Sequence, residues 1–385
     1  MIKKTILKIL FVCISFSLHA QHQLKIVVKT IPASHANETV YVAGNFNGWS
    51  PVISKLVFSE ENKEWSASFT LPKDVYEFKF TRGSWDKVQC MPGGADVQNN
   101  LVKLESDTTV TAHIAAWKDD YAASTKKHTA SANVSIMDTA FFMPQLNSKR
   151  RIWIYLPEGY KGSKKHYPVL YMHDGQNIFD EYSAGYGEWG VDECLDSLFK
   201  KNVPACIVVG IDNGPERMNE YNPFDNERFG KGKGEDYVEF LVKTLKPYID
   251  GHYRTLASKD NTMLAGSSMG GLISYYAALK YPAVFGKAGI FSPAFWTALP
   301  VNNFTDEQAQ NITGKYFFYM GGLEGGSYVE DMERIAQKLG ANSKCLIYSV
   351  VDPDSRHNEQ AWRKWFPEFY KWIMADWTNY VIREE

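Results

Sequence analysis

The stretch LAGSSMGGLISYY, residues 264–276, places two adjacent serines between glycines, after an apolar run and before a helix-like segment. The serines therefore lie on a sharp turn from a strand to a helix. In a G-x-S-x-G turn the nucleophilic serine has a strained backbone, and the residues two before and two after it must be small because they nearly touch. Gly266 and Gly270 meet this requirement for Ser268, whereas the preceding serine would have a methionine there. The stretch predicts Ser268 as a nucleophile.

The chain around this turn, from about residue 134 to the end, alternates apolar strand-like runs with helix-like stretches. The runs are RRIWIYLP, PVLYMHD, ACIVVGID, TMLAG, GKAGIFS, KYFFYMGG and KCLIYSVV, and typical helical stretches are EDYVEFLVKTLKPYI and VEDMERIAQKL. Such alternation predicts an α/β domain, a mostly parallel sheet with helices on both faces. Ligands of these folds bind at the carboxyl ends of the strands, so the residues that follow each run are candidates for chemistry.

A serine nucleophile needs a base, normally a histidine that a carboxylate holds in place. His357, in the polar loop DPDSRHNEQAW after the last predicted strand, is the one histidine that follows Ser268 in the chain. Glu324 follows the strand KYFFYMGG directly, within GGLEGG, where glycines allow a carboxylate to approach an imidazole. We expect Glu324 to be the acid, with Asp352 or Asp354 as the alternative.

Negative charge on a substrate carbonyl needs main-chain donors, one of them the amide that follows the nucleophile, here Met269. The loop YMHDGQN, after an early strand, is expected to supply the second through Gln176, with Gly175 allowing close approach. His173 and Asp174 of this loop have no metal-ligand spacing such as H-E-x-x-H, and we expect them to shape the loop. No metal and no cofactor are predicted.

Residues 22–117 have a different pattern, with short alternating strands, turns rich in Gly, Asn and Pro, and no convincing helix. This pattern predicts a small antiparallel, immunoglobulin-like β-sandwich. Residues 118–133, KDDYAASTKKHTASAN, lack periodicity and are interpreted as a linker to the α/β domain at 134–385.

Two segments of this front domain, VYVAGNFNGWSP and YEFKFTRGSWDKVQC, resemble the aromatic hairpins of glycogen- and starch-binding modules of the family-48 type. An indole presents a flat apolar face to a sugar ring, and asparagine can bond to sugar hydroxyls. The resemblance makes Trp49, Trp85 and Asn100 candidates for carbohydrate binding. The alternative is that both tryptophans only close the ends of the sandwich.

The α/β part, from about residue 134 to the end, resembles the esterase group of α/β-hydrolases. The resemblance rests on RIWIYLPEGY, YMHDGQN, GSSMGG, FSPAFW and RHNEQAW. The group includes feruloyl and acetyl-xylan esterases, siderophore esterases of the enterobactin type, and mycolyltransferases. It implies a triad of Ser268, Glu324 and His357, with the amides of Gln176 and Met269 as oxyanion hole. Glutamate at position 324, where many relatives have aspartate, is a departure from the pattern.

The acyl group is less well defined by the sequence. Trp189, Phe295 and Trp296 are expected near the mouth of the site, where they either stack on a feruloyl ring or form the wall of a pocket. Arg217 and Tyr221, in GPERMNEYNPF, are further candidates for the cleft.

Bulk properties narrow the class of partner. The chain has 42 Lys and Arg against 44 Asp and Glu, so no net field favours nucleic acid or anionic lipid. Residues 1–20, with three lysines, an apolar run at 9–18 and a small residue at Ala20, predict a signal peptide whose apolar run is too short to span a membrane. We expect a periplasmic, cell-surface or secreted protein without a membrane span in its mature form.

Four cysteines follow this segment, and none forms a C-x-x-C pair. They are expected to be free thiols, with a disulfide as the alternative in an exported chain. The four are Cys90, Cys194, Cys206 and Cys345.

These features together predict an exported serine carboxylesterase that hydrolyses feruloyl or acetyl esters of a plant-type polysaccharide or oligosaccharide. The alternatives are a siderophore esterase and a carbohydrate-binding protein with an idle hydrolase domain. The sequence does not indicate an oligomeric state.

Overall fold

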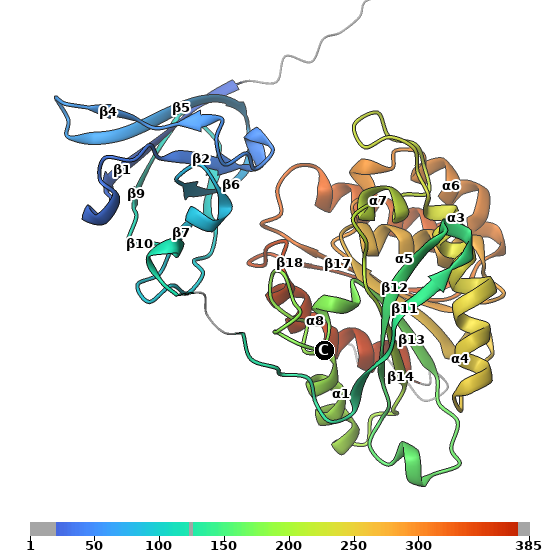
Figure 1. The fold of residues 1–385 in the computed structure, drawn as a ribbon. Coiled ribbons are helices and arrows are strands. Elements are labelled where there is room, and N and C mark those ends of the chain that lie inside the picture. The colour runs from blue at the N-terminus through green and yellow to red at the C-terminus, as the bar shows by residue number, and fades with distance from the viewer. Residues whose placement is uncertain (1–20, 123–125, 376–385) are drawn as a thin grey trace, which may run out of the picture. The chain divides into compact units, whose positions relative to one another are not determined.

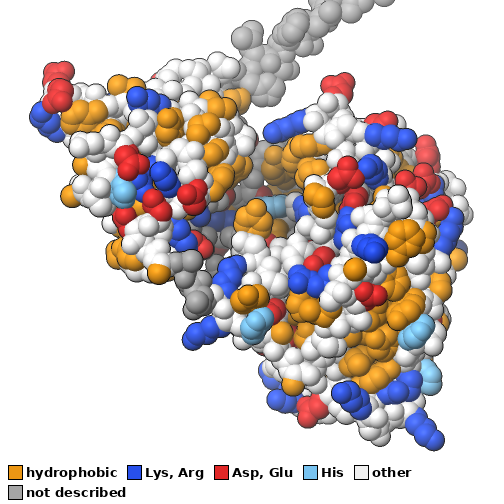
Figure 2. Space-filling view, in the orientation of Figure 1, with side chains coloured by type: hydrophobic (Ala, Val, Ile, Leu, Met, Phe, Trp, Pro, Cys, Tyr) orange, Lys and Arg blue, Asp and Glu red, His pale blue; other side chains and the backbone are white. Residues whose placement is uncertain are grey.

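The computed structural model describes residues 21–122 and 126–375 and divides the chain into two compact units, Met1–Ser124 and Thr125–Glu385 (Figure 1). The predicted signal peptide, residues 1–20, lies outside the described residues. Within the described ranges, no helix has the length and apolar character that a membrane crossing requires. Basic and acidic side chains are interspersed over both units on the face in Figure 2.

The first unit is a small β-sandwich of two four-stranded sheets with a short two-stranded ribbon. One sheet has the order β4 (Val57–Ser59), β5 (Glu64–Pro72), β1 (Gln21–Thr30), β9 (Thr108–His113). The other has the order β3 (Ser54–Lys55), β2 (Tyr41–Gly44), β6 (Asp74–Thr81), β8 (Asn100–Leu104), and the ribbon pairs β7 (Gln89–Cys90) with β10 (Ala116–Trp117). The pairs are antiparallel as predicted, except that β1 and β9 run parallel.

Alternating strand residues form the core of the sandwich. Leu24, Ile26 and Val28 of β1 point inward against Phe78 and Phe80 of β6, and all five are fully buried. This period of two is the signal from which the sequence predicts a sandwich.

The second unit contains one eight-stranded sheet, flanked by helices. Its order is β11 (Val134–Met143), β12 (Ser148–Tyr155), β14 (Ile207–Ile211), β13 (Val169–His173), β15 (Thr262–Ser267), β16 (Lys287–Phe291), β17 (Thr313–Gly321), β18 (Lys344–Asp352). The pairs β11–β12 and β12–β14 are antiparallel, and the pairs from β14 to β18 are parallel. Every residue of β13, β14 and β15 is buried, as expected for parallel strands covered on both faces.

Two apolar clusters lie on opposite faces of this sheet. Helices α1 (Val191–Lys200) and α8 (Glu359–Met374) pack in one cluster. The other cluster includes α3 (Gly234–Phe240), α4 (Lys246–His252), α5 (Met269–Lys280), α6 (Val301–Gln308) and α7 (Tyr328–Asn342). A short helix, α2 (Arg217–Glu220), follows β14. The predicted arrangement of helices on both faces is confirmed.

The boundary between the units falls within the segment interpreted as a linker, and both described flanks of that segment are anchored. Before the boundary, the Lys118 ammonium donates to the Gly94 carbonyl at 2.7 Å. After it, Thr129 N donates to Asp180 at 3.0 Å and Ser131 N donates to Asp192 at 2.6 Å.

The four cysteines of the described part of the chain are free thiols, as expected.

Candidate active site

Ser268 lies on the turn between β15 and α5, with φ 58° and ψ −121°. A non-glycine residue pays about 1–3 kcal/mol for such a backbone, which neighbouring packing must impose. A Cβ on Gly266 would lie 2.8 Å from the carbonyl carbon of Gly270, so the two glycines nearly touch, as the sequence predicts. Gly271 adds a third constraint that the sequence did not reveal, because a Cβ there would lie 2.8 Å from the Phe291 carbonyl oxygen.

Glu324 and His357 are brought together from the loops after β17 and β18. The Nδ1 atom of His357 lies 2.7 Å from Oε2 of Glu324. Because a carboxylate only accepts, Nδ1 carries the proton and Nε2 is left as the acceptor. The side chain of Glu324 is 1% exposed, whereas that of His357 is 42% exposed, so the pair has a buried acid and an accessible base.

The second oxygen of Glu324 is held by two donors. Its Oε1 atom accepts from Gly321 N at 2.8 Å and from Ser292 Oγ at 2.5 Å. The Trp362 indole donates to Ser292 Oγ at 2.9 Å, so the serine hydroxyl must direct its own proton to Glu324. This series of hydrogen bonds, from Trp362 through Ser292 to Glu324, fixes the orientation of the carboxylate.

The alternative acids are placed differently. Asp352 accepts hydrogen bonds from Ser355, Lys364 and Trp365 at 2.6–2.7 Å, so its carboxylate ties the end of β18 to α8. Asp354 donates its main-chain N–H to Asp352 at 3.4 Å. The contact with His357 therefore belongs to Glu324.

The surroundings of His357 shift its pKa upward. Removal of water around the ring lowers the pKa, but the charge and hydrogen bond of Glu324 outweigh this effect. Trp362 packs at a right angle to the ring, with centroids 5.1 Å apart and planes at 86°. The imidazole is thus held by one polar and one aromatic neighbour.

One segment, residues 291–294, connects the serine turn to the acid–base pair. Ser268 N donates to the Phe291 carbonyl at 2.9 Å, and Ala294 N donates to the Ser268 carbonyl at 3.0 Å. Between them, Ser292 holds Glu324. No hydrogen bond joins Ser268 Oγ to His357 in residues 21–122 and 126–375. Such contacts are often long without substrate and tighten in the reactive complex.

The loop after β13 reaches the first turn of α5. A Cβ on Gly270 would lie 3.2 Å from that of His173, and a Cβ on Gly175 would lie 2.8 Å from the Gly210 carbonyl carbon. In the described ranges, the N–H groups of Gln176 and Met269 donate no hydrogen bond outside their own helices. Both amides therefore remain available to a ligand, although their role as an oxyanion hole stays a prediction.

An ion pair between Asp174 and Arg217 holds this loop in place. Asp174, itself at φ 57°, accepts from Arg217 Nε at 2.6 Å and Nη2 at 2.8 Å, and from Asn213 Nδ2 at 2.6 Å. Burial raises the pKa of Asp174, but the charge of Arg217 outweighs it and holds the pKa below its usual range. His173 is buried against the Tyr237 hydroxyl, and burial lowers its pKa to about 4. Both residues shape the loop, as expected.

Two of the three predicted substrate contacts are core residues. Trp189 is buried among Phe291, Trp362 and Phe366, and Phe295 is buried against Tyr275. Trp189 and Phe295 each belong to one of the two apolar clusters, which leaves little of their surface to stack on a substrate ring, and a role as pocket wall stays a prediction.

Trp296 differs, since it is 40% exposed and lies in an aromatic group drawn from three separate segments, one of them the start of α7. It stacks on Tyr328 with centroids 6.0 Å apart, and Phe229 meets it edge-on at 6.3 Å. The adjacent Thr297 carbonyl accepts from Asn226 at 2.8 Å, which fastens this group to the loop that carries Phe229. We call Trp296, Tyr328 and Phe229 the aromatic shelf.

The candidate sugar-binding residues of the first unit are only partly grouped. Trp49 and Trp85 are neighbours, with centroids 6.3 Å apart and planes at 43°, and Trp85 is exposed. Asn100 is half-buried, and its amide donates to the Phe78 carbonyl at 3.3 Å. Whether these residues bind sugar stays a prediction.

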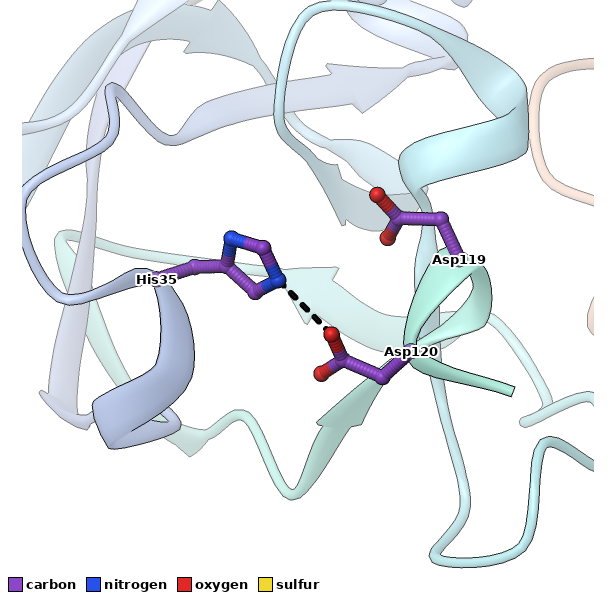
Figure 3. Close-up of side chains that lie close together, drawn as sticks. All are labelled: His35, Asp119 and Asp120. Atoms are coloured by element: carbon purple, nitrogen blue, oxygen red, sulfur yellow. Dashed lines mark hydrogen bonds and ion pairs between the residues drawn. The ribbon is translucent and has the colours of Figure 1, made fainter.

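A polar cluster in the first unit, which the sequence did not single out, joins His35, Asp119 and Asp120 (Figure 3). These three could offer ligands to a metal, since their polar atoms lie within 4.8 Å of one another. However, the buried Arg82 guanidinium bonds to Asp119 and Glu38, and each ring nitrogen of His35 already bonds to a carboxylate. Its His35 nitrogens and the Arg82 guanidinium are already bonded to carboxylates, and we assign no metal to the cluster.

The sheet order of the second unit and its strand–turn–helix serine define an α/β-hydrolase fold. Residues 144–372 match the model of the Esterase family, described as "Putative esterase", and the chain belongs to this family. The protein is a carboxylic ester hydrolase.

Two curated relatives share part of the chain. "Uncharacterized protein YbbA" of Bacillus subtilis is 29% identical over 184 residues, which are 46% of this chain and 69% of the relative. An "Endo-1,4-beta-xylanase/feruloyl esterase" of Xylanibacter ruminicola is 29% identical over 162 residues, 41% of this chain and 21% of the relative. The chain thus spans about a fifth of that second protein.

Solved structures show the same fold at low identity. The BES protein of Bacillus cereus has a TM-score of 0.54 at 18% identity, covering 66% of this chain and all of its own. The enterochelin esterase of Shigella flexneri has a TM-score of 0.54 at 16% identity, covering 87% of each chain.

Proposed function

We propose that the protein is an exported serine carboxylesterase that cleaves feruloyl or acetyl esters on plant-type polysaccharides or oligosaccharides. The observation that carries the proposal is the strained Ser268 turn, tied through residues 291–294 to the hydrogen-bonded pair of His357 and Glu324. Such an arrangement suits acyl transfer through an acyl-enzyme.

In the proposed reaction, Ser268 Oγ attacks the ester carbonyl while His357 Nε2 takes its proton. The N–H groups of Gln176 and Met269 stabilise the oxyanion. His357 then donates the proton to the leaving alcohol oxygen, and a water molecule repeats the sequence on the acyl-enzyme. Glu324 keeps the proton of the neutral ring on Nδ1 and stabilises the imidazolium that forms.

The aromatic shelf favours an aromatic acyl group over acetyl. The N–H of Ala294 bonds to the Ser268 carbonyl, and the exposed Trp296 lies two residues after Ala294 in the chain. An offset aromatic contact adds about 0.5–1.5 kcal/mol beyond area burial, which a feruloyl ring can use and an acetyl group cannot.

A siderophore esterase is the competing function, and it would need a cationic pocket for catecholates. Arg217 is a cation beside the serine turn, and both oxygens of the Asp174 carboxylate already bond to it. Its charge is therefore balanced locally, which favours neutral polyhydroxyl esters. The Xylanibacter relative is named a feruloyl esterase as well as a xylanase, which also favours this interpretation.

The test combines labelling with substrate comparison. A fluorophosphonate probe should label the purified protein at Ser268, and Ser268→Ala should lose labelling and about a million-fold of its turnover. Methyl ferulate, acetylated xylan and a catecholate triester are then compared side by side. Failure of labelling would favour an idle hydrolase domain, and fastest cleavage of the catecholate would favour a siderophore esterase.

A further inference from the structure

Glu359 is an acidic residue at this site that the proposed reaction does not use. It is the first residue of α8, two positions after His357, and it is only 8% exposed. In the described part of the chain, its carboxylate bonds to its own main-chain N–H and to no other side chain. A carboxylate that is more than nine-tenths buried and lacks a side-chain donor is expensive, and such groups usually serve a ligand.

The surroundings of Glu359 place it on the catalytic face. The charges of His357, Asp174 and Arg217 all act on its carboxylate. A Cβ on Gly187, in the segment before α1, would lie 3.8 Å from the Cβ of Glu359. The acid therefore lies within electrostatic range of both the base and the ion pair that supports the loop after β13.

Arg217 offers donors in the same region. Its Nε and Nη2 atoms bond to Asp174, and Nη2 also lies 3.5 Å from the Ser267 carbonyl, next to the nucleophile. Its Nη1 atom donates no hydrogen bond within residues 21–122 and 126–375, and the side chain is 26% exposed. The Glu359 carboxylate, which accepts from no side chain, and the Nη1 group of Arg217, which donates no hydrogen bond in the described residues, therefore both lie close enough to His357 for their charges to act on it.

The direction of proton transfer decides which half of the substrate meets these groups. His357 must reach the leaving oxygen, so the alcohol half of the ester lies beside His357, while the carbonyl oxygen faces the Gln176 and Met269 amides. A carboxylate that accepts and a guanidinium that donates match the adjacent hydroxyls of a sugar.

We propose that Glu359 and Arg217 form a subsite for the hydroxyl groups of the alcohol half, which makes the enzyme selective for sugar esters over simple alkyl esters. The inference rests on the proposed function. It assigns recognition of the alcohol half to residues of α8 and α2, whereas the aromatic shelf is proposed to bind the acyl half.

The experiment compares two esters that share one acyl group, feruloyl or acetyl, whichever the wild type cleaves faster. One ester is that of an arabinose or xylose hydroxyl and the other is the methyl ester. The ratio of kcat/KM for the sugar ester to kcat/KM for the methyl ester is measured for the wild type, Glu359→Gln and Glu359→Ala. Glu368→Gln, an exposed glutamate on the same helix, is the matched control.

We expect the wild type to prefer the sugar ester, and Glu359→Ala to lower the ratio by about tenfold or more, the usual effect of losing a charged hydrogen bond. Glu359→Gln keeps one acceptor and should give a smaller drop, and it carries the test if the alanine variant does not fold. An equal ratio in wild type and both folded variants, or a wild type without preference, would overturn the inference. In that case Ser268 would still be labelled and both esters would still be cleaved. Failure of the subsite proposal can therefore be told apart from failure of the proposed function.

Discussion

Replacing Glu324 by glutamine tests the acid–base pair with almost no change in shape. Two donors, Gly321 N–H and the Ser292 hydroxyl, point at Oε1 of Glu324. A glutamine must place its carbonyl oxygen there, because an NH2 group would face two donors. The amide nitrogen then faces His357 and donates to Nδ1.

This donation reverses the histidine tautomer. With Nδ1 as acceptor, the proton of the neutral ring moves to Nε2, which can no longer take a proton from Ser268. A comparable amide substitution in a serine-protease triad lowers kcat by about ten-thousand-fold, which corresponds to about 5.5 kcal/mol of transition-state stabilisation. We expect a loss of about a thousand- to ten-thousand-fold in kcat for Glu324→Gln, with an unchanged circular dichroism spectrum.

The pH profile gives a second, independent signature. Glu324 raises the pKa of His357, and the base must be neutral to act, so the acid limb of kcat/KM in the wild type lies at the raised value. Without the carboxylate the pKa falls, and the acid limb of the residual activity should shift to lower pH.

Asp352→Asn serves as the control, because Asp352 was the alternative acid and its bonds run to Ser355, Lys364 and Trp365. Asp352→Asn should lower the thermal midpoint of unfolding and have little effect on kcat. If Glu324→Gln keeps more than a tenth of wild-type kcat while Asp352→Asn loses most of it, the assignment of Glu324 is wrong.

Three further predictions follow from the packing and the charges. Gly266→Ala places a Cβ 2.8 Å from main-chain atoms across the serine turn and should lower kcat and the labelling rate at least about a hundredfold, whereas Gly162→Ala, in open space, should leave both within twofold. Burial raises the pKa of Glu359 from 4.5 to about 7, so the free energy of unfolding falls by up to about 3 kcal/mol as the pH rises from 4 to 9. Glu359→Gln removes this titration and should therefore raise the thermal midpoint by several degrees at pH 9 but not at pH 4. Trp49→Ala or Trp85→Ala should weaken retention of the protein on polysaccharide, with cleavage of a small dissolved ester as the control, and undiminished retention would make the module structural.

The strand–turn–helix geometry around Ser268 could be predicted because it depends on local chemistry. Small residues two positions either side of the serine are required by a contact within one pentapeptide, and Gly266 and Gly270 are visible in the sequence. Glu324 and His357 were predictable for a similar reason, since each follows a strand of a parallel sheet and such ends gather at one edge.

Contacts that depend on tertiary packing were not predictable in this way. An aromatic residue looks the same in the sequence whether it faces a ligand or the core, so the sequence could not show that Trp189 and Phe295 are buried. The bond from Trp362 to Ser292 joins residues 70 positions apart, and no local pattern signals it. The parallel pairing of β1 with β9 likewise depends on how the two sheets close.

The helix α8 has a consequence for how the enzyme can fail. It supplies Trp362, which bonds to Ser292 and packs at a right angle to the His357 ring, and it packs in the apolar cluster on the face of the sheet opposite to α5. The helix that follows the nucleophilic serine and the helix that follows the base therefore pack in different apolar clusters, on opposite faces of the sheet. Local unfolding of α8 would displace His357 while the sheet remains folded. Stored or heated samples should therefore lose turnover before they lose secondary structure.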